Sequence, residues 1–172
     1  MADQTVIITD KDTRRRNRPT TDGPTRELFI PGDKLGASAN VYANGEMIGN
    51  LIKLQGALQD KDGYTTLMSA MIHDLAQQGV NLEVIIFASE PSATTFTDGD
   101  ALAINPADLI KIKASEVVDV SREYDGNSIG IKGNIGQPIK GTSDLDLWVC
   151  FVARGAMTLT ENSLSAILEF FG

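Results

Sequence analysis

Short runs of Val, Ile, Leu and aromatic residues recur along this chain about every ten residues, separated by Gly, Pro, Asn and Asp. Such spacing of apolar runs and turn residues is typical of all-β sandwiches and barrels. The runs are also much shorter than the roughly 20 apolar residues that cross a bilayer. A chain of 172 residues is long enough for one core but short for two ordinary domains. The sequence therefore predicts a single antiparallel β-sandwich, jelly-roll-like, over residues 27–172.

The run from Leu145 to Arg154 is the best strand candidate, because it is rich in aromatic and β-branched residues and stops at Gly155. We expect it to be central in its sheet, with both faces covered. Alternation assigns Leu145, Leu147, Val149, Phe151 and Ala153 to one face, and Asp146, Trp148, Cys150 and Val152 to the other. The full set of candidate strands is 28–30, 46–58, 64–75, 81–88, 109–120, 128–135, 145–154 and 164–171, and Val6 to Ile8 could add a short one.

The segment from Tyr64 to Gln78 fits two structures. Its apolar residues have the i, i+3, i+4 spacing of an amphipathic helix that would end at Gly79. As a strand, it would be followed by a hairpin turn at 77–81 leading into 81–88. The strand would place Thr66, Met68, Ala70 and Ile72 inward, and Ser69, Met71 and His73 on the opposite face.

The polar stretch 87–109 is the first place to look for chemistry. Asp98, Asp100 and Asp108 could suggest calcium, but they lack the ordered spacing of a calcium loop, and such residues more often form turns. We expect a surface connector between two strands, fixed to the core by Phe96 and Leu102. Asn105 before Pro106 predicts a single capped helical turn within it.

Few nucleophile and base pairs can be built from one cysteine and one histidine. Ser89 or Ser92 would need His73 as a base, and no motif joins them. Cys150 lies mid-strand among bulky apolar residues, which favours a buried inert thiol over a partner for His73. The glycines of 126–136 lack a phosphate-binding pattern and predict a turn and a kinked strand. We expect no catalytic residues, no metal and no cofactor.

Charge is unevenly distributed: the whole chain is −8, residues 1–26 are +2, and residues 27–172 are −10. The basic cluster consists of Arg14, Arg15, Arg16 and Arg18, in a segment with little apolar periodicity. We interpret residues 1–26 as a flexible basic arm that contacts an acidic protein surface. Nucleic acid is a poorer partner, because the body is acidic and the arm has no aromatic residue for stacking. The start of the chain has no secretion-signal pattern, so we expect folding in a cytoplasm.

Several motifs, taken in order, resemble a family of small virion structural proteins of tailed bacteriophages. The resemblance covers about residues 43–172; Ser89-Glu90 and Gln137 depart from the usual pattern, and residues 1–42 lie outside it. The motifs are Phe87-Ala-Ser-Glu-Pro-Ser-Ala-Thr-Thr-Phe-Thr-Asp98, Ala101 to Ile104, Ala107-Asp-Leu109, Asn134-Ile-Gly-Gln-Pro-Ile-Lys140, Leu147-Trp-Val-Cys-Phe-Val-Ala-Arg-Gly155 and Leu164 to Phe171.

The resemblance implies a β-sandwich head decoration, or cement, protein that binds the outside of an expanded capsid, often as a trimer. It also favours the strand over the helix for 64–78. The implied partners are the major capsid protein and further copies of this chain, and the arginine cluster would be a capsid contact. Deleting residues 1–25 should then weaken attachment and leave the β-domain folded. The alternatives are a carbohydrate-binding module, which would need exposed aromatic residues, and a tail or neck component of the virion.

Overall fold

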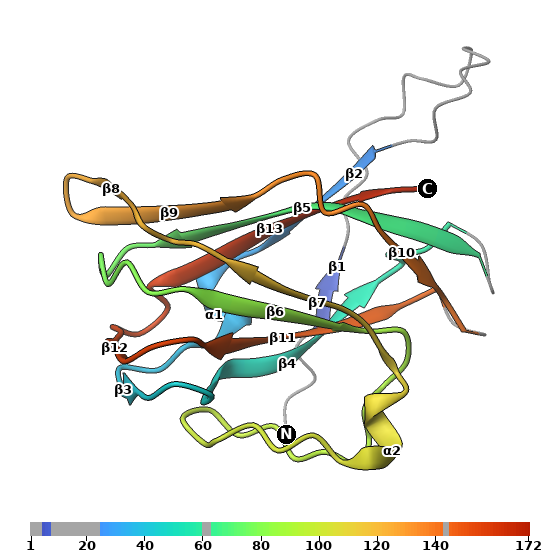
Figure 1. Ribbon diagram of the computed structural model, residues 1–172, viewed down its shortest axis with the longest axis horizontal. Helices are drawn as coiled ribbons and strands as arrows, with labels where there is room; N and C mark the ends of the chain where they lie inside the picture. Colours follow the sequence, from blue (N-terminus) through green and yellow to red (C-terminus); the bar gives the residue numbers. More distant parts are fainter. Residues whose placement is uncertain (1–4, 8–24, 60–62, 143–144) are drawn as a thin grey trace.

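Two β-sheets packed face to face form the body of the protein (Figure 1). The computed structural model describes residues 5–7, 25–59, 63–142 and 145–172. Among the described strands, β1 alone runs parallel to a neighbour, and all other pairs are antiparallel. The antiparallel β-sandwich expected from the spacing of the apolar runs is confirmed.

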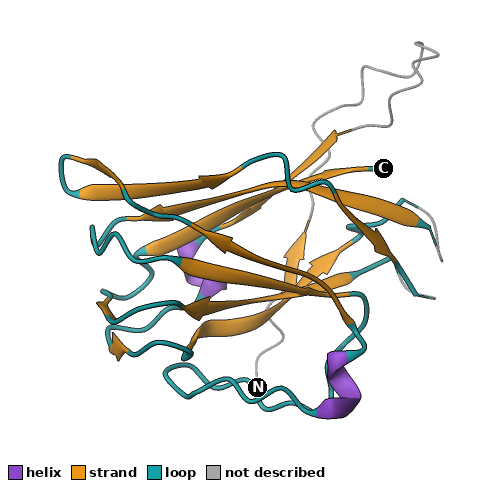
Figure 2. Cartoon of the chain, in the orientation of Figure 1, coloured by secondary structure: helices purple, strands orange, loops and turns teal. Residues whose placement is uncertain are grey.

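The smaller sheet has five strands and the larger has six. In spatial order the smaller sheet contains β1 (Thr5–Ile7), β4 (Met47–Gln55), β11 (Leu147–Ala153), β6 (Leu82–Phe87) and β7 (Ile112–Val118). The larger sheet contains β2 (Thr25–Ile30), β13 (Leu164–Phe171), β5 (Tyr64–Asp74), β9 (Asn127–Lys132) and β8 (Arg122–Tyr124), with β10 (Gln137–Lys140) also paired to β5. A two-stranded ribbon joins β3 (Val41–Tyr42) to β12 (Met157–Thr158), and the helices are short: α1 (Gly32–Leu35) and α2 (Pro106–Leu109) (Figure 2).

The order of the long strands is that of a jelly roll. If the short strands β1, β3, β8, β10 and β12 are set aside, eight strands remain in chain order. The larger sheet contains, side by side, the first (β2), eighth (β13), third (β5) and sixth (β9) of these strands. The smaller sheet contains the second (β4), seventh (β11), fourth (β6) and fifth (β7). This arrangement is a pair of Greek keys folded into a double sheet. The jelly-roll-like sandwich predicted from the sequence therefore has this topology in full.

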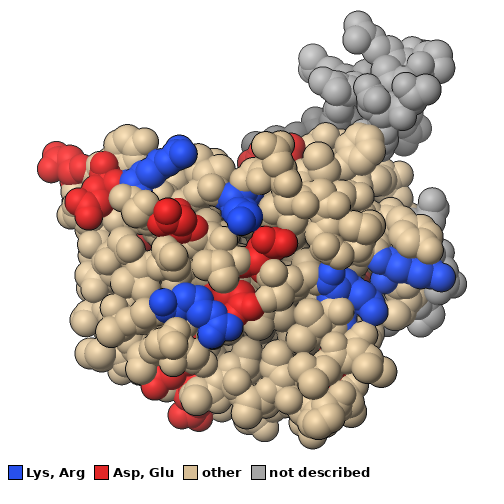
Figure 3. Space-filling view, in the orientation of Figure 1, with Lys and Arg blue, Asp and Glu red and all other residues tan. Residues whose placement is uncertain are grey.

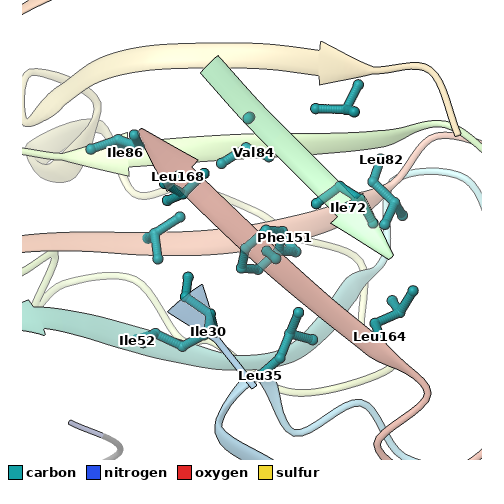
Figure 4. Close-up of a cluster of buried hydrophobic side chains, with 14 of the residues drawn as sticks. Ile30, Leu35, Ile52, Ile72, Leu82, Val84, Ile86, Phe151, Leu164 and Leu168 are labelled. Atoms are coloured by element: carbon teal, nitrogen blue, oxygen red, sulfur yellow. The ribbon is translucent and has the colours of Figure 1, made fainter. Parts of the chain in front are cut away.

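The main core lies between the two sheets, and β11 crosses its centre (Figure 4). β11 pairs with β4 on one side and β6 on the other, so it is central as expected. Val149 and Phe151 point into the main core, whereas Cys150 and Val152 belong to a second cluster on the outer face. Burying one such side chain contributes about 1.5–3 kcal/mol. The predicted alternation and the covering of both faces are confirmed.

Residues 64–74 form a strand, which settles the ambiguity between helix and strand. The predicted inward set is only half right: Ala70 and Ile72 are buried, but Leu67 is buried in place of Met68. The reason is a register shift against β13, where Glu169 pairs with Ser69 and Phe170 with Leu67. The extra residue of this bulge reverses the alternation.

The hairpin predicted between 64–75 and 81–88 is wrong. β5 lies in the larger sheet and β6 in the smaller, so residues 75–81 cross between the sheets. The apolar faces of both strands thereby reach the same core. The predicted strand 128–135 is also broken: β9 ends at Lys132, and β10 resumes the pairing with β5 at Gln137. The turn expected near Gly126 joins β8 to β9, with Gly126 at φ +89°.

The N-terminal arm predicted over 1–26 contains described strand residues at both ends. β1 pairs with β4 at the edge of the smaller sheet, and β2 begins at Thr25 at the edge of the larger one. Residues 8–24 join these two edge strands. The four arginines of the basic cluster, Arg14, Arg15, Arg16 and Arg18, lie outside the described residues, so the contact role assigned to them stays a prediction.

Candidate functional site

The chain covers the outer face of the smaller sheet with its own connector. Residues 88–111, which join β6 to β7, run beneath this sheet in Figure 1. Phe96 and Leu102 pack on an apolar cluster of the sheet, and the Phe96 ring meets Phe87 edge to face with centroids 5.9 Å apart. The surface connector fixed by Phe96 and Leu102 is therefore confirmed, and we call residues 88–111 the covering loop.

Asp98 anchors one part of the covering loop to the body. Its Oδ1 accepts hydrogen bonds from the Tyr42 hydroxyl at 2.8 Å and the Gly49 N–H at 2.5 Å. Its Oδ2 accepts one from the Ser38 hydroxyl. Burial raises the pKa of Tyr42 to about 12, and the Asp98 carboxylate acts in the same direction. Tyr42 therefore stays a neutral donor to Asp98 well above neutral pH.

Asp108 anchors the other part of the loop from within α2. Its Oδ2 accepts hydrogen bonds from the Ala93 N–H at 2.9 Å and the Thr94 hydroxyl at 2.8 Å, and its Oδ1 lies 2.8 Å from Lys111 Nζ. Burial alone would raise the pKa of Asp108, but these partners lower it overall. Asn105 caps α2 by accepting from the Ala107 N–H, as its place before Pro106 predicts.

The three aspartates considered for calcium therefore have different roles. Asp98 and Asp108 accept hydrogen bonds from the protein itself. Asp100 is exposed and, among the described residues, accepts a hydrogen bond only at its backbone carbonyl. Within the part of the chain that the structure describes, no group of three or more His, Cys, Asp or Glu side chains is placed to hold a metal ion. The arrangement indicates turn-forming and anchoring carboxylates.

The structure keeps apart the groups that could have paired in nucleophilic catalysis. Cys150 is fully buried under the covering loop, and this burial raises the pKa of its thiol. His73 lies on the outer face of the larger sheet, across the sandwich, where its Nε2 is 3.1 Å from Met71 Sδ. Ser89 and Ser92 belong to the covering loop, on the side of the smaller sheet. The geometry therefore supports none of the pairings considered.

A shallow hollow of about 460 Å³ opens within the covering loop. Small and hydroxyl-bearing side chains dominate its lining, and Asp100 is the one ionisable residue among the described residues that line it. A glycoside hydrolase needs two carboxyl groups about 5–10 Å apart. The hollow offers one, so its chemistry does not suit that reaction.

The outer face of the larger sheet carries a row of apolar side chains with no described helix or strand outside it (Figure 1). Register aligns Phe29 of β2, Ile167 of β13, Met71 of β5 and Ile131 of β9 across four adjacent strands. Phe29 is 52% exposed and Ile131 is 43% exposed. We call this outer face of β2, β13, β5, β9 and β8 the bare face.

Among the described residues, the charged side chains of the bare face lie at the flanks of this row. On one side, Glu27 and Glu169 stand directly opposite each other on β2 and β13, and Glu169 accepts a hydrogen bond from the Ser69 hydroxyl at 2.8 Å. Neither carboxylate has an ion-pair partner among the described residues. On the other side, the next row across the sheet contains His73 of β5, Ile129 of β9 and Arg122 of β8, paired in that order. Like charges directly opposite across strands destabilise a sheet, so the Glu27–Glu169 pair is a cost that a cation from outside could offset.

Sequence reasoning did not identify the bare face. A signal was present: strand 164–171 carries large apolar residues on both of its faces, with Ile167 and Phe171 opposite to Leu168. Nothing in the sequence indicates which of the two sheets the covering loop covers. In the view of Figure 3, basic and acidic side chains are interspersed, without a field of one sign. None of the described helices is long and apolar enough to span a membrane.

Comparison with known proteins gives matches to solved structures alone. No protein-family model matches the sequence, and no curated protein does. Among solved structures, the chain is similar to one of infectious bursal disease virus, Gx strain, with 12% identity over 87% of this chain and a TM-score of 0.33. It is similar to the VP2 subviral particle of the same virus, with 14% identity over 87% of this chain and a TM-score of 0.32. The chain spans about a third of the length of these proteins, covering 32% and 33% of them.

Proposed function

We propose that this chain is a structural protein of a virion, and specifically a decoration (cement) protein that binds the outside of an expanded bacteriophage head. The observation that carries the proposal is the jelly-roll order of its two sheets, an architecture used by viral capsid proteins as well as by lectins and cupins. The motifs of residues 43–172 resemble phage virion proteins, which supports the first of these uses. In this role the protein performs no chemistry.

A decoration protein stabilises an expanded shell by mass action, because it binds that shell and not the precursor. The role needs a rigid body and an accessible contact surface. The anchored covering loop supports the first requirement and the bare face the second. In the proposed assembly the chain acts as a trimer on the capsid exterior, with the major capsid protein as its partner. Several attached copies raise one another's effective concentration at the shell.

The test is co-sedimentation of the purified protein with expanded empty capsids that lack it, counting bound copies per shell. Saturation at a copy number set by the symmetry of the shell is the expected result. A protein that stays in the supernatant with shells of verified competence would contradict the proposal, and would point to a tail or neck component.

The contribution of the arginine cluster is tested by substitution, because deleting residues 1–25 would also remove β1 and Thr25 of β2. The variant replaces Arg14, Arg15, Arg16 and Arg18 with Gln. Its matched control removes four lysines of the body: Lys34, Lys113, Lys132 and Lys140. We expect weaker capsid binding for the arginine variant alone. Equal weakening in both variants would show a general charge effect and would remove the assigned role of the arm.

A carbohydrate-binding module is a second candidate, because Tyr64 and Tyr124 are 65% and 58% exposed. Exposed aromatic rings are the feature that such a module requires. The Tyr64 ring, however, is already occupied by Lys140, whose Nζ lies 5.7 Å from its centroid. Binding of the protein to a glycan array, lost in Tyr124→Ala, would favour this second function over the first.

A further inference from the structure

We infer that the bare face is the surface by which this protein docks on its shell, and that the matching surface of the shell protein is apolar with an Arg or Lys at its border. This inference rests on the proposed function and adds to it the docking face and the chemistry of the partner.

The first step of the argument is the contrast between the two sheets. Both have apolar residues on their outer faces, but on the smaller sheet the covering loop buries most of them, and Val117 on the edge strand β7 stays 43% exposed. On the larger sheet the row from Phe29 to Ile131 stays open to solvent, at 52% and 43% exposure for its end members. Contiguous exposed apolar patches in soluble proteins commonly mark interaction sites. A fold that already covers one such face leaves the other available for a partner.

The second step concerns size. The five strands from β2 to β8 have 6, 8, 11, 6 and 3 residues, which makes 34 in all. At about 3.3 Å per residue along a strand and about 4.8 Å between strands, they cover about 540 Å². This area is about two thirds of the roughly 800 Å² that each partner contributes to a stable protein–protein interface. The bare face is therefore large enough to supply most of a docking contact.

The third step identifies the partner by charge. Glu27 and Glu169 repel each other across β2 and β13, at the edge of the apolar row. A partner that covered this edge with apolar atoms would bury two unpaired carboxylates, which is strongly unfavourable. A partner that placed a guanidinium or ammonium group there would pair with both, and would offset their repulsion. A second copy of this chain fits less well, because an acidic body of −10 would approach another.

The experiment measures binding of purified full-length protein to expanded empty capsids that lack it. Two variants alter the bare face: Phe29→Ser removes the apolar anchor, and Glu27→Lys with Glu169→Lys reverses the charge at its border. Two controls remove apolar side chains elsewhere that are more exposed than Phe29: Val41→Ser in the β3–β12 ribbon and Ile110→Ser beside α2, which are 67% and 77% exposed. Circular dichroism confirms that each variant is folded, and light scattering gives the mass of each free protein.

The expected result is binding weaker by about tenfold or more in both bare-face variants, as for hot-spot residues of an interface, with control variants like the wild type and no change in mass. Wild-type binding that persists in both bare-face variants would overturn the docking face while leaving the proposed function intact. A smaller free mass in the bare-face variants would assign this surface to contact between copies, and would equally overturn the inference. Wild-type protein that binds no capsid would remove the proposed function and this inference with it.

Discussion

Tyr42 shows how a single residue can hold a loop in place. Its side chain is fully buried, yet its hydroxyl reaches Asp98 in the covering loop, at 2.8 Å. A hydrogen bond between a neutral donor and a carboxylate is strong, provided that the donor keeps its proton. Because the pKa of Tyr42 is raised, its hydroxyl keeps its proton over the ordinary range of pH.

The first prediction concerns Tyr42 and alkaline pH. Because the pKa of Tyr42 is about 12 in the folded protein and 10.0 without its environment, its contribution to stability is complete below about pH 10 and is lost as the pH rises through 12. Tyr42→Phe should lower stability at pH 8 by roughly 1–2 kcal/mol. It should also remove the last step from a spectroscopic titration of the tyrosines.

Denaturant unfolding at pH 8 and absorbance at high pH measure the two effects. Tyr124→Phe, which alters an exposed tyrosine, is the control and should leave stability unchanged. A Tyr42→Phe protein that keeps both the wild-type stability and the late titration step would contradict this assignment.

At the scale of the element, the covering loop depends on Asp108. This carboxylate joins α2 to Ala93 and Thr94, at the start of the loop. Because its pKa is lowered from 3.8, its contribution is present above about pH 4 and is lost as the pH falls through the lower, folded-state value. The loop should therefore stay closed over the sheet through all mildly acidic conditions.

The second prediction uses Cys150, which lies beneath the loop, as a reporter. Asp108→Ala should loosen the loop and expose the thiol, so that labelling by a thiol reagent becomes at least several-fold faster than in the wild type. Asp100→Ala, which removes a loop carboxylate with an exposed side chain, should label at the wild-type rate. Equal labelling rates in all three proteins would show that the loop is held without Asp108.

Local sequence signals were enough for some elements and insufficient for others. β11 follows from its alternating bulky residues, and α2 follows from Asn105 before Pro106. The bulge of β5 depends on its register with β13, about 100 residues away in the chain, as in the bond between Ser69 and Glu169. Such a pairing leaves no trace in the local pattern. The crossing from β5 to β6 was missed for the same reason: a turn of the same composition can close a hairpin or change sheets.

The candidate site was harder to predict than the fold, because exposure is a property of the whole molecule. Ile85 and Ile131 look equally suited to a core, yet the first is buried beneath the covering loop and the second is 43% exposed. The difference arises from which sheet the loop covers, and that choice depends on anchors such as Asp98, whose partners Tyr42 and Gly49 lie in another part of the sequence.

The third prediction belongs to the whole molecule and separates two modes of attachment. Contact through the arginine cluster is electrostatic and should weaken with NaCl, because the Debye length falls from about 10 Å at 0.1 M to about 3 Å at 1 M. Contact through the apolar row should be much less sensitive. In capsid co-sedimentation, the variant with all four arginines replaced should therefore show a shallower salt dependence than the wild type, and Phe29→Ser should keep the full dependence. Parallel salt dependences in all three proteins would contradict this division.

The unequal treatment of the two sheets also limits what the protein can build. The covering loop closes most of one outer face, so, of the two described sheets, the larger one carries the apolar row that is open to a partner. A body with complementary adhesive patches on opposite sides could stack copy upon copy into fibres. If a partner occupies the open face of this protein, the face that points away from the partner is the one closed by the covering loop. A layer of such molecules would then remain one molecule thick.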